Sequence, residues 1–173
     1  ARLRALEQDR VIGRATRAEV HRNPALTHRA VHILVFRPDG RLLLQLRSPD
    51  KDVDPGLWDT SVGGHVDAGE DYLTAALREL SEELGIEGVE LEFLYDLRYR
   101  SARESEAIRS YRLVWAGPVR PHPVEIAAVR DWTRDEIEAA LGGGKLTRNF
   151  EQEWLRFKRW EAERDQGLGS SER

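Results

Sequence analysis

The segment from Gly64 to Ile86 constrains the fold most, because a glycine-containing loop there leads into an acidic amphipathic helix. The helix is predicted from about Asp71 to Leu84, and Gly85 supplies the left-handed conformation that ends it. At about 100° per residue, apolar side chains form one stripe and three glutamates share another face. The stripe is Leu73, Ala76, Leu77, Leu80 and Leu84, and the acidic face is Glu79, Glu82 and Glu83.

This acidic face is costly unless a cation neutralises it. Two of its glutamates lie four residues apart, about 6 Å along the helix axis, where like charges repel. Mg²⁺ suits such a face because it takes oxygen ligands and bridges carboxylates to substrate phosphates. Gly63 and Gly64 let the backbone approach the ion closely. Arg78 is expected to offset one charge and to orient Glu70 or a catalytic glutamate.

Strand signals elsewhere predict a mixed α/β protein. Residues of high β propensity flank the turn-forming Pro38-Asp39-Gly40, which predicts a strand, a turn and a second strand over residues 31–46. The loop from 47 to 69 is interrupted only by a short strand. The other predicted strands span residues 11–16, 58–62, 90–100, 108–117 and 128–132.

Capping residues and the spacing of aromatic residues predict three further helices, near the two ends of the chain. Thr16 and Glu19 form a potential capping box for a single turn ending near His21, and Thr133 caps a helix reaching Leu141. A last helix is predicted over residues 148–164. Its aromatic stripe favours core packing over stacking on a base, and consists of Phe150, Trp154 and Phe157.

Composition narrows the classes of function. The 173 residues suit a single domain, predicted over 1–166 with an N-terminal arm over 1–28 and a disordered tail over 167–173. A net charge of -4 without a long basic run argues against nucleic acid as a partner. No apolar run approaches the roughly 20 residues that span a bilayer, so neither a transmembrane helix nor a membrane partner is predicted. Residues 1–22 alternate charged with apolar residues and do not resemble a signal peptide, which predicts a cytoplasmic location. Because cysteine is absent, any metal must bind carboxylates, histidines or carbonyls, which favours a hard ion.

Residues 64–86 also resemble the Nudix box. Its pattern is Gly, five residues, Glu, seven residues, then Arg-Glu-aliphatic-any-Glu-Glu-any-Gly-aliphatic, and every fixed position is present. The resemblance implies an α/β/α sandwich with a central mixed sheet and a hydrolase in which water attacks phosphorus. It also implies that Glu82, Glu83 and the Gly63 carbonyl bind the metal, with Glu79 as a ligand or general base. The general base outside the box varies in this family, and Glu125 is a weak candidate.

His21 and His28 stand seven residues apart, His65 follows Gly64, and Glu104-Ser105-Glu106 follows Arg98-Tyr99-Arg100. With these residues, the chain over about residues 17–132 resembles the Nudix branch that contains type I isopentenyl-diphosphate isomerases. In those isomerases three histidines and two glutamates hold a divalent metal. The resemblance therefore implies a second site for an ion such as Zn²⁺ or Mn²⁺, formed by His21, His28, His65, Glu104 and Glu106. The isomerases also use a cysteine where this chain has Gly63, so the resemblance favours an isomerase-like hydrolase over an isomerase.

The predicted function is Mg²⁺-dependent hydrolysis of the diphosphate linkage in a nucleoside diphosphate or a related small phosphorylated metabolite, with Mn²⁺ as an alternative ion. Two alternatives stay open: an isopentenyl-diphosphate isomerase using another acid, and a catalytically silent binding module. Trp58, Tyr99 and Tyr111 could stack on a base, although core or strand-face packing is the more common role of such residues. A homodimer is also left open.

Overall fold

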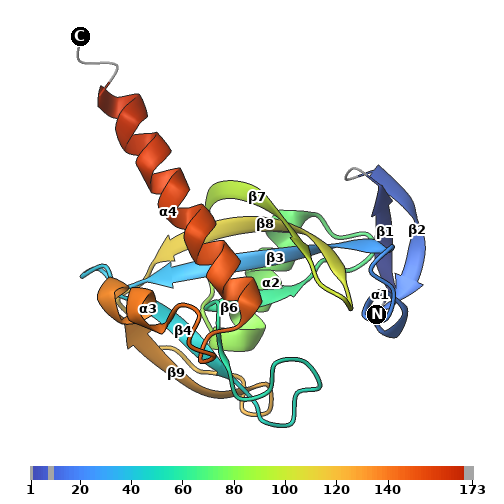
Figure 1. Ribbon diagram of the computed structural model, residues 1–173, viewed down its shortest axis with the longest axis horizontal. Coiled ribbons are helices and arrows are strands. Elements are labelled where there is room, and N and C mark those ends of the chain that lie inside the picture. The colour runs from blue at the N-terminus through green and yellow to red at the C-terminus, as the bar shows by residue number, and fades with distance from the viewer. Residues whose placement is uncertain (1, 8–9, 170–173) are drawn as a thin grey trace.

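A nine-stranded mixed sheet organises residues 2–7 and 10–169, the part of the chain that the computed structural model describes (Figure 1). The central strand β3 runs parallel to β8 and antiparallel to β1, β4 and β6. The strands are β1 (Arg2–Glu7), β2 (Arg10–Thr16), β3 (Thr27–Phe36), β4 (Leu42–Arg47), β5 (Trp58–Asp59), β6 (Val62–His65), β7 (Glu92–Arg100), β8 (Ser105–Val114) and β9 (Ile126–Trp132). The helices are α1 (Arg17–Val20), α2 (Tyr72–Leu84), α3 (Arg134–Ala140) and α4 (Arg148–Gly169).

Strand β3 builds two cores because successive side chains point to opposite faces of the sheet. Val31, Ile33 and Val35 pack with the buried face of α2. Leu34 and Phe36 pack on the other face with α3 and α4, and all three members of the aromatic stripe predicted on α4 are buried there. Figure 1 shows α2 and α4 on opposite sides of the sheet. The predicted α/β/α sandwich with a central mixed sheet is therefore confirmed.

Helix α2 begins and ends at the predicted caps, but its buried stripe differs from the prediction. The Asp71 side chain accepts a hydrogen bond from the backbone N–H of Thr74, and Gly85 is left-handed with φ 67°. Leu73 and Leu77 belong to the predicted apolar stripe, yet they are 47% and 37% exposed. The first turn is anchored differently, because the Tyr72 ring packs on the core, with Arg29 and Arg109 over it, and Ala75 and Ala76 are buried.

The number of helices agrees with the prediction, whereas the structure has more strands than were predicted. The two strands that flank the turn at residues 38–40 share only the pair Phe36 and Leu42, because β8 and β6 pair with β3 while β4 pairs with β9. The predicted strand over 58–62 is two strands, β5 and β6, and β6 continues through the glycine pair to His65. Strand β1 was not predicted.

The predicted capping box of Thr16 with Glu19 is present, and the predicted cap Thr133 also forms a capping box, with Glu136. Helix α4 extends five residues beyond the predicted end, so residues 167–169 are helical rather than part of the tail. Residues 170–173 of that predicted tail lie outside the described residues. Within the described ranges, no helix is long and apolar enough to cross a membrane.

Candidate active site

A cleft of about 1230 Å³ opens where β6, the N-terminal arm and the loop before β8 meet. Its lining includes the three glutamates of the acidic face of α2 and several histidines. The loop over residues 50–55 and the segment holding His122 and Glu125 also contribute to its walls. Most residues predicted from the sequence to be functional therefore line one cavity.

The floor of this cleft is formed by the contact between α2 and the glycine pair of β6. Glu83 accepts hydrogen bonds from the Gly63 N–H at 3.1 Å and from Gln45 Nε2 at 3.0 Å. A Cβ added at Gly64 would lie 2.2 Å from Glu79 Cδ, so only glycine leaves room for that carboxylate. Glu82 is different, because its side chain is 56% exposed at the rim.

Arg78 joins the loop and the helix into one unit, as predicted. Its guanidinium donates two hydrogen bonds of 2.8 Å to Glu70 and one of 2.8 Å to Glu79. It also donates to the His65 carbonyl at 3.0 Å. Glu70 in turn accepts from the Asp67 N–H at 2.9 Å, and these hydrogen bonds, that from Arg78 foremost, lower the pKa of Glu70. Arg78 thus orients both Glu70 and Glu79.

The electrostatics of the floor favour a cation. Burial raises the pKa of Glu83 to about 8, and the neighbouring charge of Glu79 adds to this effect. Burial also raises the pKa of Glu79 despite the adjacent Arg78. A positive ion between these oxygens would stabilise their ionised forms.

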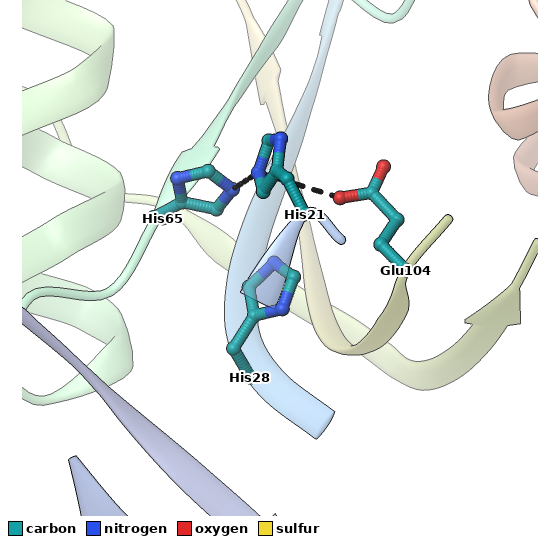
Figure 2. Close-up of side chains that lie close together, drawn as sticks. All are labelled: His21, His28, His65 and Glu104. Atoms are coloured by element: carbon teal, nitrogen blue, oxygen red, sulfur yellow. Dashed lines mark hydrogen bonds and ion pairs between the residues drawn. The ribbon is translucent and has the colours of Figure 1, made fainter. Parts of the chain in front are cut away.

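The five residues implied as a second metal site lie together, and all but His28 line the cleft. Figure 2 shows four of them, and one donor atom from each of His21, His28, His65 and Glu104 lies within 4.8 Å of the others. The Nε2 atom of His21 is 3.2 Å from His65 Nε2 and 3.4 Å from Glu104 Oε2. Glu106 Oε1 lies 3.3 Å from His28 Nε2 and 3.9 Å from His65 Nε2.

The topology explains why these distant residues meet. His28 in β3 and Glu106 in β8 are register partners in the parallel pair, while His65 ends β6 on the other side of β3. The short helix α1 places His21 over them. Burial lowers the pKa of His65 to about 3 and also lowers that of His21, so both imidazoles are neutral and keep a lone pair for a metal.

The other candidates have mixed positions. Glu125 lines the cleft and pairs with Lys51. Tyr99 lines the cleft as well, whereas Tyr111 packs in the core beside α2 and Trp58 packs edge-on against Trp132. Of the three aromatic residues considered for stacking, only Tyr99 lies at the cleft.

Sequence reasoning missed several residues of the cleft, above all His32, Gln45 and Asn149. A signal existed for His32, because it interrupts the apolar run of a strand that is buried on both faces. Glu153, which pairs with His32, lies among the aromatic stripe of α4 and is equally out of place in a core. No local pattern points to Gln45 or Asn149.

Comparisons with known proteins agree with this geometry. The chain is 35% identical over 156 residues to an uncharacterized Nudix hydrolase of Streptomyces coelicolor, and this match covers 89% of the chain and 86% of the relative. It is 37% identical over 142 residues to an isopentenyl-diphosphate Delta-isomerase of Nocardia farcinica, covering 78% and 80%. The crystal structure of DR0079 from Deinococcus radiodurans has a TM-score of 0.71 and 25% identity, covering 85% and 92%. Since the NUDIX domain model also matches residues 26–150, this chain belongs to the Nudix hydrolases, in the branch that resembles isopentenyl-diphosphate isomerases.

Proposed function

We propose that this Nudix hydrolase cleaves the diphosphate linkage of a nucleoside diphosphate or a related small phosphorylated metabolite, with Mg²⁺ as its ion. Nudix hydrolases act on small phosphorylated substrates and use divalent metal ions. One observation carries the proposal: Glu79 and Glu83 are held at the floor of an open cleft, by Arg78 and by the Gly63 N–H.

The donor set fits Mg²⁺, which prefers oxygen ligands. Glu79, Glu82, Glu83 and the Gly63 carbonyl would hold the ion, and Mn²⁺ could take its place. The raised pKa of Glu83 supports this assignment, because a buried carboxylate needs a nearby positive charge to ionise at neutral pH. The bound ion would neutralise phosphate oxygens and make water more acidic.

The residues of the chain then have separate tasks. Arg78 fixes the orientation of Glu79, and Gln45 fixes that of Glu83. Glu79 serves as a metal ligand or as the general base. Glu125 is a second candidate base, which would first have to leave Lys51. Arg47 and Lys51 in the cleft wall supply positive charge for the phosphates.

Substitution of the glutamates tests this function. We expect Glu82→Gln or Glu83→Gln to lower kcat by at least about a hundredfold with Mg²⁺, since each removes a charged ligand. The substrate is found first, by screening nucleotides, nucleotide sugars and prenyl diphosphates with product identification. Glu90→Gln, an exposed change outside the cleft, is the matched control. Near-normal turnover in either ligand variant would remove α2 from the mechanism.

We further propose that His21, His28, His65, Glu104 and Glu106 bind a second divalent ion. Imidazole nitrogens combined with carboxylates suit Zn²⁺ or Mn²⁺ better than Mg²⁺. Glu104 Oε2 is buried without a hydrogen-bond partner among the described residues, although His21 Nε2 lies 3.4 Å away. An ion at this point would satisfy that oxygen and the neutral imidazoles together. It would either clasp the N-terminal arm or anchor a phosphate.

The amount of metal bound per chain tests whether this second site exists. The double variant His21→Ala with Glu106→Gln is dialysed against Zn²⁺ or Mn²⁺ beside the wild type, and bound metal is quantified. We expect the variant to bind one ion fewer per chain. Unchanged stoichiometry and affinity would show that the five residues have no metal role and would leave α2 as the one site still proposed.

A further inference from the structure

A buried ion pair between His32 and Glu153 lies where α4 packs on the sheet, in a region filled mainly by apolar side chains. His32 is 6% exposed and Glu153 is 0% exposed, and His32 Nδ1 lies 3.7 Å from Glu153 Oε2. Removing a charged group from water costs several kcal/mol, which a single imperfect pair does not fully offset. Within the described residues, both carboxylate oxygens of Glu153 are buried without a hydrogen-bond partner. The core gains nothing in stability that explains this pair.

The surroundings of the pair are polar as well. Ser110 of β8 is the register partner of His32, and its hydroxyl is buried without a hydrogen-bond partner in the described part of the chain. Tyr95 donates from its hydroxyl to the Glu153 carbonyl at 3.3 Å. Asn149, one turn before Glu153 on α4, lines the cleft. Polar groups that violate the rules of core packing are most often found at functional sites.

One edge of the His32 ring lies at the cleft, and the opposite edge lies against the carboxylate of Glu153. His32 lines the cleft beside its register partner Gly63. A Cβ added at Gly63 would lie 3.2 Å from His32 Cδ2 and 3.5 Å from Nε2, so this edge of the ring borders the glycine. The Nδ1 edge faces Glu153. The imidazole therefore has Nδ1 toward Glu153 and Nε2 on the side of the cleft.

His32 also lies between the two candidate metal positions. It shares a face of β3 with His28, four residues and about 13 Å away, and it borders Gly63 at the other site. We propose that His32, anchored by Glu153, donates a hydrogen bond from Nε2 to the diphosphate group of the substrate. This inference rests on the proposed function, and it assigns His32 as a substrate-binding residue. Such a donor would add a charge-assisted contact to those that the metal ions, Arg47 and Lys51 would make with the substrate.

Calorimetry in the presence of Mg²⁺ tests the inference with methylenediphosphonate, a diphosphate analogue whose P–C–P bridge water does not cleave. We expect His32→Phe to weaken binding at least about tenfold, the usual scale of a hydrogen bond to a charged group. His32→Gln keeps a donor and should retain most of the affinity. Leu34→Ala is the matched control, because it removes core packing on the same face of β3 without touching the cleft. It should lower the unfolding temperature and leave the affinity unchanged.

The outcomes separate a binding role from a packing role. Wild-type affinity in His32→Phe, or equal losses in His32→Phe and His32→Gln, would overturn the inference. So would a wild-type protein that does not bind methylenediphosphonate with Mg²⁺. If the wild type binds this probe in the expected pattern but hydrolyses no diphosphate, the proposed function fails and the role of His32 in binding stands.

Discussion

Gly64 illustrates how a single residue shapes the site, because its lack of a side chain makes room for a carboxylate. An added Cβ would lie 2.4 Å from Glu79 Oε1 as well as 2.2 Å from Cδ. The backbone at Gly64 is not left-handed, so alanine is tolerated by the chain itself. The clash is with the end of a flexible side chain, which can move away. The requirement for glycine is therefore one of function more than of stability.

Gly64→Ala is expected to lower kcat at least about a hundredfold, because a displacement of about 1 Å at a reacting centre has that effect. The same variant should unfold at nearly the temperature of the wild type. Gly13→Ala, in β2, is the matched control, since a Cβ there meets nothing within 4 Å. Turnover in Gly64→Ala equal to that of Gly13→Ala would show that Glu79 need not occupy its observed position.

At the scale of elements, local signals predicted α2, α3 and their caps well. Asp71, Thr133 and Gly85 act on residues within one turn of themselves, so the sequence contains the whole interaction. The partners of β3 come from residues 2–7 to 105–114, and no local pattern encodes such pairing. The exposure of Leu73 and the contact between His32 and Glu153 depend on tertiary packing in the same way. Of the two candidate metal sites, the acidic face of α2 was predicted from helix geometry and charge, whereas only a family resemblance linked the residues of the histidine site.

The end of α2 allows a test of conformational strain at the scale of an element. Gly85 and Gly88 both have left-handed backbones, with φ of 67° and 68°. A Cβ at Gly85 would also lie 3.2 Å from Arg120 Cβ, whereas nothing lies within 4 Å at Gly88. We expect Gly88→Ala to cost about 1 kcal/mol in unfolding free energy and Gly85→Ala measurably more. Equal losses on urea denaturation would mean that the Arg120 segment shifts freely.

For the whole molecule, the charge of the cleft bears on the proposed role of the metal ions. Its lining holds eleven carboxylate side chains and only four from lysine or arginine. A diphosphate entering this cleft would meet net negative charge unless divalent ions neutralise the carboxylates first. The two candidate metal positions are therefore best understood as parts of one binding surface. This requirement is common to hydrolysis and isomerisation, so the cleft alone does not separate the two reactions.

Isomerisation and hydrolysis differ in that only isomerisation moves protons to and from carbon atoms. Isomerisation of isopentenyl diphosphate requires a group that delivers a proton to a carbon atom, and the isomerases that this chain resembles use a cysteine for it. This chain has Gly63 at that place and no cysteine anywhere in its sequence. Conversely, Glu79, Glu82 and Glu83, which hydrolysis would use, are all present on α2.

We therefore expect the purified protein to release a hydrolysis product from its substrate and to show no interconversion of isopentenyl and dimethylallyl diphosphates. Both diphosphates are incubated with protein and Mg²⁺, with Zn²⁺ or Mn²⁺ added in parallel, and the products are separated by chromatography. A metal-only sample is the control for uncatalysed change. Steady isomerisation above that control would mean that another acid in the cleft replaces the cysteine. The first candidate would be Glu106 on β8, whose carboxylate lies beside His28 and His65.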